Sequence, residues 1–188
     1  YKSLPYDPVK SFTPVTKLVD SAYVLLVNPK VPAATASELI RLAREKPGTL
    51  NFASAGQGSI THMACELFAH LAGIRMNHIP YKGTGPALTD TIGGQTDLFC
   101  TSTATALAHV KSGKLRALAV TTATRLAAEP GIPTLAESGV KGYDVPIWHG
   151  LIGPKGMPRA AVDRLNAESN KLLQSKETAD LLETDGVS

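Results

Sequence analysis

Residues 51–73 read NFASAGQGSITHMACELFAHLAG, and this stretch decides the fold. A short apolar run is followed by a Gly-rich loop and then by apolar residues at helical spacing, which is typical of a strand, a turn and a helix. The loop, residues 54–59, contains no acidic side chain. Because a helix N-terminus carries unpaired N–H groups and the positive end of the helix dipole, the pattern favours an anion site. A plain turn that needs Gly for its backbone angles is the alternative.

The same arrangement occurs twice more in the next fifty residues. The strand ends and the helices that follow them are 77–80 with 87–92, and 97–100 with 105–111. Thr84 is expected to be the N-cap of the first of these helices, with Pro86 in its first turn. In an open sheet of parallel strands, such turns share the edge at which ligands bind. The three turns, residues 53–62, 81–86 and 100–105, carry no carboxylate, so we expect a crevice that prefers negative charge.

Strands and helices alternate through most of the chain, which predicts a parallel α/β sheet covered by helices on both faces. The expected strands are 12–17, 23–27, 50–53, 76–79, 97–100 and 115–120, followed by a long extended stretch at 143–152. The expected helices begin at a Thr35/Glu38 capping box and then cover 60–71, 87–92, 105–111, 134–138, a stretch opened by Pro158, and 177–183. One apolar stripe of the second helix holds Ile60, Met63, Ala64, Leu67 and Leu71, and Val162, Leu165 and Leu172 should face inward.

Composition limits the function classes. The 188 residues suit one sizeable domain or two small lobes. Lys and Arg outnumber Asp and Glu by 19 to 16, and this excess of basic residues is too small and too scattered for a nucleic-acid surface. The apolar stretch Tyr23–Val27 is far too short to cross a membrane. Cys65 and Cys100 have neither metal spacing nor a disulfide framework, so we expect buried free thiols, although their pairing stays open. We expect no cofactor and no metal.

The chain closely resembles the periplasmic solute-binding proteins of tripartite tricarboxylate transporters, the TctC or Bug family. The resemblance is carried, in the family's order, by LPYDPVKSFTPV (4–15), FASAGQGSITHMACELF (52–68), HIPYKGTGPALTDTIGGQTDLF (78–99), KSGKLRALAVTT (111–122), PTLAESGVKGYDV (133–145) and WHGLIGPKGMP (148–158). It implies an α/β fold of the type II periplasmic binding protein kind, a two-lobed Venus flytrap that closes on its ligand. It also implies a small carboxylate as ligand, a di- or tricarboxylate or an aromatic acid, and delivery to the permease subunits of a membrane transporter.

The resemblance also implies a domain organisation. Family members begin with a signal peptide and more of the first lobe, so the chain is expected to hold a complete second lobe and a partial first one. Residues 1–20 would be part of the first lobe, 21–142 the second lobe with a mostly parallel sheet and the ligand loops, and 143–188 the return crossover and first-lobe helices. We expect a periplasmic monomer that does not insert into a membrane.

The family's ligand loop falls on the residues that the anion argument selects, namely Ser54, Ala55, Gly56, Gln57, Gly58 and Ser59. Tyr81 belongs to a second matching segment, with a partly structural role. Thr101 and Ser102 stand where many relatives have an Asp-Asn pair, and without that acid a simple carboxylic acid is favoured over an amino acid. Trp148 matches an aromatic residue of the crossover, and it could stack on a ligand or only pack. His149, beside it, could add positive charge or stay neutral.

A small α/β enzyme is the alternative function. Cys65 or Ser59 would be the nucleophile of a hydrolase, or the amide loop would hold a phosphate for a transferase. The phosphate version lacks the Lys-Ser/Thr pair of a P-loop, and no oriented third residue is evident for His62 and Cys65 on their shared helix face. A binding protein is therefore the favoured interpretation.

Overall fold

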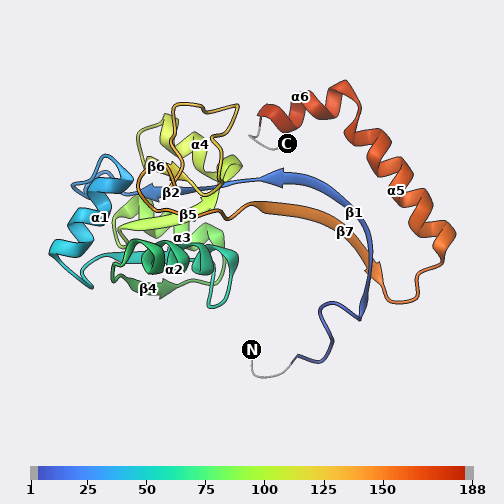
Figure 1. Ribbon diagram of the computed structural model, residues 1–188, viewed down its shortest axis with the longest axis horizontal. Coiled ribbons are helices and arrows are strands. Elements are labelled where there is room, and N and C mark those ends of the chain that lie inside the picture. The colour runs from blue at the N-terminus through green and yellow to red at the C-terminus, as the bar shows by residue number, and fades with distance from the viewer. Residues whose placement is uncertain (1–3, 185–188) are drawn as a thin grey trace. The chain divides into compact units, whose positions relative to one another are not determined.

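The computed structural model describes residues 4–184, and it divides into two compact units. One unit comprises residues 1–21 and 147–188, and the other comprises residues 22–146. Figure 1 shows their helices and strands. In the larger unit these are β2 (Tyr23–Val27), α1 (Ala36–Glu45), β3 (Asn51–Ser54), α2 (Ile60–Ala72), β4 (Asn77–Pro80), α3 (Thr84–Gly93), β5 (Leu98–Ser102), α4 (Thr103–Lys111) and β6 (Arg116–Val120). The division of the chain into lobes stays a prediction.

The sheet of the larger unit has the strand order β4-β3-β5-β2-β6. β3 pairs in parallel with both β4 and β5, whereas β2 is antiparallel to β5 and to β6. Four strands therefore point the same way, and the expectation of a parallel sheet is wrong for β2 alone. The physical reason is the connection that precedes it. β2 follows an extended segment with no crossover helix, and only a crossover would force a parallel entry.

The core lies on both faces of this sheet. Side chains alternate across a strand, so Leu25 and Val27 pack with residues of α1 and α2, while Val24 and Leu26 pack with Ala106 of α4. These four β2 side chains have no exposed surface. A third cluster joins Ala53, Ala87 and Phe99 between β3, α3 and β5. Helices thus cover both faces, as the alternation predicts.

The helix ends show which sequence signals hold. Thr35 Oγ1 accepts a hydrogen bond from the Glu38 amide at 3.2 Å, and Glu38 Oε2 accepts from the Ala34 amide at 2.6 Å, which is the predicted capping arrangement one residue wider. The expected cap of α3 is wrong by one residue, because Gly83, with a φ of 114°, takes that place and Thr84 is already helical.

The expected helix at 134–138 is also wrong. These residues form a single hydrogen-bonded turn, closed by the Thr134 hydroxyl and the Glu137 carboxylate, and Gly139 follows with a φ of 99°. A capping pair without a following apolar repeat therefore produces one turn and no helix.

The buried face of α2 is rotated from the apolar stripe in its sequence. Ala64 is buried, but Ile60, Met63 and Leu71 are exposed. Small and polar residues fill most of the inner face instead, together with Phe68: Thr61, His62, Ala64, Cys65, Ala69 and Ala72. Close packing of the helix on the sheet selects small side chains, and the hydropathy pattern alone does not report this.

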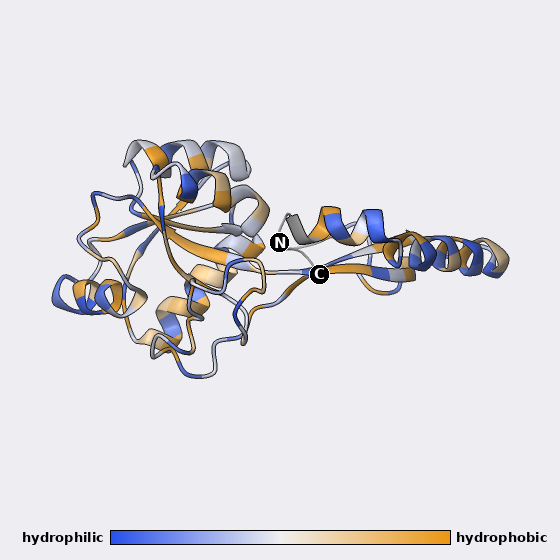
Figure 2. Ribbon diagram, turned by 90° about the horizontal axis from the view of Figure 1, so that it is seen from above, coloured by the Kyte–Doolittle hydropathy of each residue, from blue (hydrophilic) through white to orange (hydrophobic). Residues whose placement is uncertain are grey.

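The smaller unit is built on an antiparallel ribbon of β1 (Phe12–Ser21) and β7 (Ile147–Pro154), followed by α5 (Arg159–Leu173) and α6 (Lys176–Thr184). Asn166 Nδ2 donates to the Val15 carbonyl at 2.8 Å and ties α5 to the ribbon. Figure 2 shows apolar and polar residues mixed along α5. Val162 is buried as expected, but Leu165 and Leu172 are exposed, because α5 packs on one narrow ribbon.

None of the described helices combines the length and the apolar composition that crossing a membrane requires.

Candidate functional site

Three strand-to-helix turns meet at one edge of the sheet. β4, β3 and β5 are neighbours and run parallel, so the turns that lead into α3, α2 and α4 all leave from their carboxyl ends. The first two turns also bond to each other. The Tyr81 amide donates to the Ser54 carbonyl at 3.0 Å, and the Gly83 amide donates to the Ala55 carbonyl at 3.1 Å. The edge thus has the topology at which open α/β sheets bind ligands.

The β3–α2 loop, residues 54–59, needs its two glycines. Gly56 has a φ of 136° and Gly58 a φ of 75°, both in the region that side chains disfavour. A Cβ atom on Gly56 would also lie 3.3 Å from the Tyr81 carbonyl oxygen, whereas one on Gly58 would meet nothing within 4 Å. Gly56 therefore permits the close approach of the two turns, and Gly58 serves the backbone angle only.

Most amides of this loop already donate to protein acceptors, which corrects the expectation of a loop of free amides. Ala55 N donates to Thr61 Oγ1 at 2.8 Å, Gly56 N to Ser54 Oγ at 3.1 Å, and Gly58 N to His62 Nδ1 at 3.2 Å. The Ser59 amide donates to the Gly56 carbonyl at 3.1 Å. Short polar side chains in a loop and in the first helical turn compete for such donors, which is why the sequence overstates their number.

Donors remain at the mouth of the loop. Within the part of the chain that the structure describes, the backbone amides of Gln57, Ile60 and Thr61 donate no hydrogen bond. Thr61 is only 2% exposed, which leaves the amides of Gln57 and Ile60 for a ligand. Gln57 is exposed, and the Ile60 side chain is 45% exposed. These two amides lie at the start of α2, where the helix dipole favours an anion.

The Ser59 hydroxyl is occupied as the N-cap of α2. It donates to the Gly56 carbonyl at 2.7 Å and accepts from the His62 amide at 3.3 Å. Cys65 is a free thiol with no exposed surface, and so is Cys100. Contact with Cys65 and burial raise the pKa of Cys100 well above its usual range. The hydrolase alternative therefore lacks a nucleophile, because Cys65 is buried and the Ser59 hydroxyl bonds to the backbone and not to a base. The prediction of buried free thiols is confirmed.

Tyr81 directs its hydroxyl away from the loop. The hydroxyl donates to Asp90 Oδ2 of α3 at 2.8 Å. Burial, together with this hydrogen bond, raises the pKa of Tyr81 to about 12. Its ring packs on the cluster formed by Ala53, Ala87 and Phe99. The side chain fixes the second turn onto α3, and only its backbone reaches the first turn.

The third turn contributes partly accessible hydroxyls. Thr101 is only 2% exposed and lies opposite Val24 in the sheet. Ser102 is half-buried at the N-cap of α4, and its Oγ lies 2.9 Å from Oγ1 of Thr105, which is also half-buried. Of the two predicted residues, Ser102 therefore reaches the edge, and Thr101 is buried.

Trp148 and His149 lie in the other unit, on β7. Trp148 pairs with Asp20 and is 63% exposed, and its ring covers Gly150, where a Cβ atom would lie 3.0 Å from Trp148 Cζ3. His149 pairs with Val19 and is also exposed. Both side chains are free to contact a ligand, and that role stays a prediction.

Sequence reasoning missed a pair of stacked histidines behind the loop. The rings of His62 and His78 lie 3.9 Å apart at an interplanar angle of 24°, and Phe52 stacks on His78 at 4.9 Å. His78 Nε2 lies 2.6 Å from Ser54 Oγ. Burial is the main cause that lowers the pKa of His78, followed by His62, while Glu66 acts in the opposite direction. Strand register holds the signal that was overlooked, because it places His78 beside Phe52.

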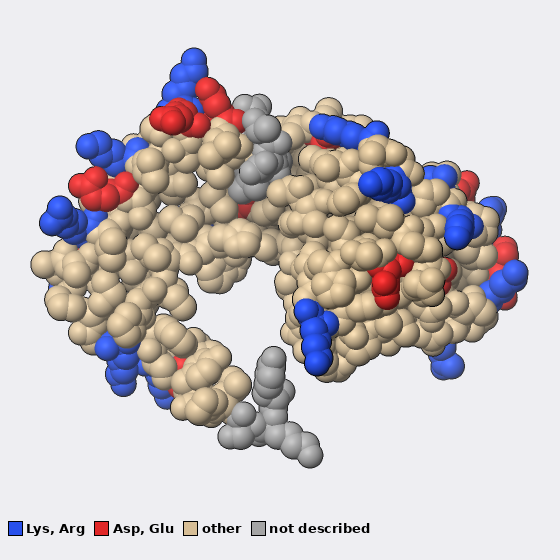
Figure 3. All heavy atoms as spheres, turned by 180° about the vertical axis from the view of Figure 1, so that it is seen from behind, with Lys and Arg blue, Asp and Glu red and all other residues tan. Residues whose placement is uncertain are grey.

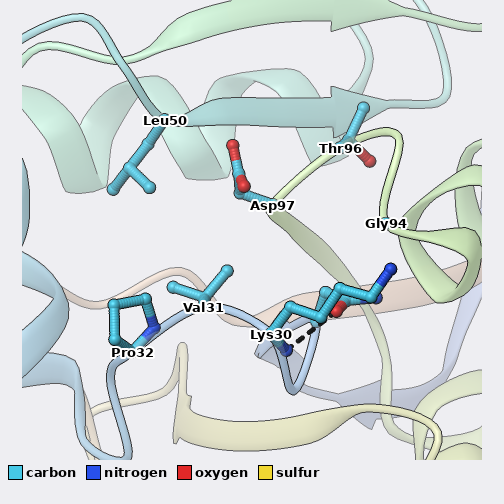
Figure 4. Close-up of a pocket in the computed structure, with 8 residues that line it drawn as sticks. Lys30, Val31, Pro32, Leu50, Gly94, Thr96 and Asp97 are labelled. Carbon is cyan, nitrogen blue, oxygen red and sulfur yellow. Dashed lines mark hydrogen bonds between the residues drawn. The ribbon is translucent and has the colours of Figure 1, made fainter.

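A cavity of about 130 Å³ lies at the opposite end of the strands, beside the starts of β3 and β5 (Figure 4). Its polar groups serve the fold. Asn28 Nδ2 donates to the Thr91 carbonyl at 2.8 Å, Asn28 Oδ1 accepts from the Lys30 amide at 2.9 Å, and Asp97 Oδ2 accepts from the Asn51 amide at 2.7 Å. The cavity is therefore a structural feature rather than the predicted site.

Surface charge agrees with the composition. On the face shown in Figure 3, the described Lys and Arg side chains are dispersed and lie among Asp and Glu side chains. That face carries no broad basic patch of described residues, which nucleic-acid binding would need. Among the described residues, no group of His, Cys, Asp and Glu has an arrangement that could hold a metal ion.

Residues 1–188 match the family described as tripartite tricarboxylate transporter family receptor, TctC. A curated relative from Pseudomonas sp. (strain P51), named UPF0065 protein in tcbD-tcbE intergenic region, is 36% identical over 188 residues, which is 100% of this chain and 56% of the relative. The chain thus spans little more than half the length of this relative.

Two solved structures are similar over almost the whole chain. An R. palustris protein with adipate has a TM-score of 0.95 and 32% identity, covering 100% of this chain and 63% of that one. MatC from Rhodopseudomonas palustris with bound malate has a TM-score of 0.89 and 32% identity, covering 98% and 63%. The predicted fold class, α/β and of the periplasmic binding protein kind, is confirmed. The matched family and these neighbours are substrate-binding proteins, not enzymes.

Proposed function

Because the chain belongs to the tripartite tricarboxylate transporter receptor family, we propose that it is part of a periplasmic solute-binding protein that captures a small carboxylate for a membrane transporter. The observation that carries this proposal is the acid-free edge at which the β3–α2, β4–α3 and β5–α4 turns meet. Neighbours with adipate and with malate support a ligand of the carboxylate class.

The energetics set how many contacts such a ligand needs. Removing a carboxylate from water costs several kcal/mol, and each charge-assisted hydrogen bond returns about 1.5–3 kcal/mol. Two or three donors for each carboxylate are therefore required. The amides of Gln57 and Ile60 and the hydroxyl of Ser102 are three candidates in the larger unit. The ligand contact expected of Trp148 and His149 stays a prediction.

The remaining loop residues would act through shape. Ser54, Ala55, Gly56, Gly58 and Ser59 hold the loop by hydrogen bonds within the protein, and Tyr81 anchors the neighbouring turn. In this proposal they set the position of the two free amides.

Thr101 and Ser102 influence ligand choice. No acidic side chain stands at these two positions or elsewhere in the three turns to pair with an ammonium group. We therefore expect a simple carboxylic acid to bind more tightly than the corresponding amino acid. The permease subunits of the transporter would be the downstream partners.

Thermal shift measurements test this proposal. Adipate and malate at saturating concentration should raise the melting temperature, because a ligand that binds only the folded state stabilises it. 2-Aminoadipate and adipamide, which add an ammonium group to adipate or remove its charges, are the matched controls and should raise the melting temperature less. The acid should be recovered unchanged after incubation. Equal shifts with adipamide, no shift with any acid, or consumption of the acid would contradict the proposal.

A further inference from the structure

Two imidazole rings hold the two ends of the ligand loop, residues 54–59. At the first end, His78 Nε2 lies 2.6 Å from Ser54 Oγ. At the other end, His62 Nδ1 accepts a hydrogen bond from the Gly58 amide at 3.2 Å. The rings stack on each other at 3.9 Å, so the two contacts form one unit.

The chemistry of the Gly58 contact depends on the charge of His62. A neutral imidazole that accepts at Nδ1 carries its proton on Nε2, and a protonated imidazole donates from both nitrogens and accepts at neither. Protonation of His62 therefore removes the acceptor of the Gly58 amide. Histidine is the side chain whose charge changes in the mildly acidic range.

Among the residues that the structure describes, one charged group faces the pair. On α2, Glu66 Oε1 lies 3.5 Å from His62 Nε2, and the Glu66 side chain is 49% exposed. From β3 the pair meets Phe52 and Ser54, which carry no charge in this range. β4 contributes His78 itself. The Glu66 carboxylate can balance the positive charge of one protonated ring. Protonation of the second ring would then place two positive charges side by side.

We propose that the neutral His62–His78 pair positions the ligand loop, and that protonation of the pair releases its Gly58 end and weakens carboxylate binding. Both histidines are positioning residues, because they act through Ser54 and Gly58 and not on the ligand. The effect on binding rests on the proposed function, whereas the effect on the loop does not.

The loop is tested first, without any ligand, by an NMR pH titration of the chain. The Gly58 amide resonance should move with the same midpoint as the His62 ring, and its protection against exchange should fall as the pH is lowered. His62→Asn places an acceptor that does not titrate near the position of Nδ1 and should abolish this movement. His70→Asn, on the exposed side of the same helix, should leave it unchanged. A Gly58 resonance that ignores pH, or that titrates equally in His62→Asn, would overturn the proposal.

Binding is tested next by calorimetric titration with adipate. His62→Leu, which has no acceptor, should weaken binding about tenfold at neutral pH, since one hydrogen bond is lost, and His62→Asn should restore it to within about twofold. Equal weakening in both variants would overturn the proposal, because a structural loss alone would not be rescued. If adipate binds no variant while Gly58 titrates as expected, the proposed function fails and the inference about the loop stands.

Discussion

Gly56→Ala is the substitution that tests the geometry of the ligand loop most severely. The new Cβ atom would lie 3.3 Å from the Tyr81 carbonyl oxygen, on a backbone with a φ of 136°. The approach is between two backbone segments, so a side-chain rotation cannot relieve it. The variant should still fold, but with the two turns pushed apart.

The magnitude follows from two costs. A residue with a side chain held in a sparsely populated backbone region costs about 1–3 kcal/mol, and forcing an extra methyl group into a packed site adds about 1 kcal/mol or more. We therefore expect the free energy of unfolding to fall by about 2–4 kcal/mol. For a chain of this size that corresponds to a melting temperature lower by about 4–16 °C.

Urea unfolding followed by circular dichroism measures this difference, and two other glycines provide matched controls. Gly58→Ala has a positive φ of 75° but open space, so only the backbone cost of about 1–2 kcal/mol should appear. Gly93→Ala lies at the last residue of helix α3 with nothing within 4 Å and should be neutral or stabilising by up to about 1 kcal/mol. If Gly56→Ala is no more destabilised than Gly58→Ala, the close contact between the two turns is refuted.

Three further changes probe stability elsewhere. Leu26→Ala removes a fully buried side chain of β2 and should cost about 2–5 kcal/mol in urea unfolding; a loss below about 1 kcal/mol would contradict the core assignment. Thr35→Ala removes the cap of α1 and should cost about 1 kcal/mol, whereas Thr35→Ser should cost much less. The pKa of His78 is lowered in the folded state, so the unfolded chain binds the proton more readily. The contribution of His78 to the free energy of unfolding should therefore be fully present above a pH of about 6.5 and should be lost as the pH falls below it. His78→Gln should reduce this dependence of the free energy of unfolding on pH, and an unchanged dependence would rule out His78 as its source.

Local signals in the sequence predicted the elements at the site well. The Gly-rich loop and the apolar spacing that follows it locate α2, and the same kind of signal locates α3 and α4 to within a few residues. These signals succeed because glycine angles and capping hydrogen bonds are properties of a few neighbouring residues. Convergence of the three turns followed from the rule for parallel strands, and β4, β3 and β5 obey it.

Features that depend on packing were not predicted. The inner face of α2 uses Thr61, His62 and Cys65, while the more apolar Ile60 and Met63 are exposed. Hydropathy ranks side chains by their transfer from water, but the contact of a helix with a sheet selects them by size and shape. The direction of β2 depends on how the chain enters the sheet, which no pattern within residues 23–27 reports.

The satisfied amides of the ligand loop show the same limit at the site itself. The sequence shows that residues 54–59 carry backbone donors, but it does not show which nearby acceptor turns toward each of them. The hydrogen bonds from the amides of Ala55 and Gly58 to the side chains of Thr61 and His62 were therefore not expected. The histidine pair was missed because His62 and His78 are sixteen positions apart in the sequence and meet only through strand register.

The central claim is that the acid-free edge at the start of α2 binds an organic carboxylate, and calorimetric titration of Gln57→Glu with adipate tests it most directly. Gln57 is exposed, so the new carboxylate should not disturb the fold, and at about 5 Å in a partly solvated site it should oppose the ligand by about 1–2 kcal/mol. Gln95→Glu, beyond the far end of α3, is the control of equal charge. We expect the dissociation constant to rise about tenfold for Gln57→Glu, less so at high salt, and to stay unchanged for Gln95→Glu. Equal affinity in the two variants would contradict the account.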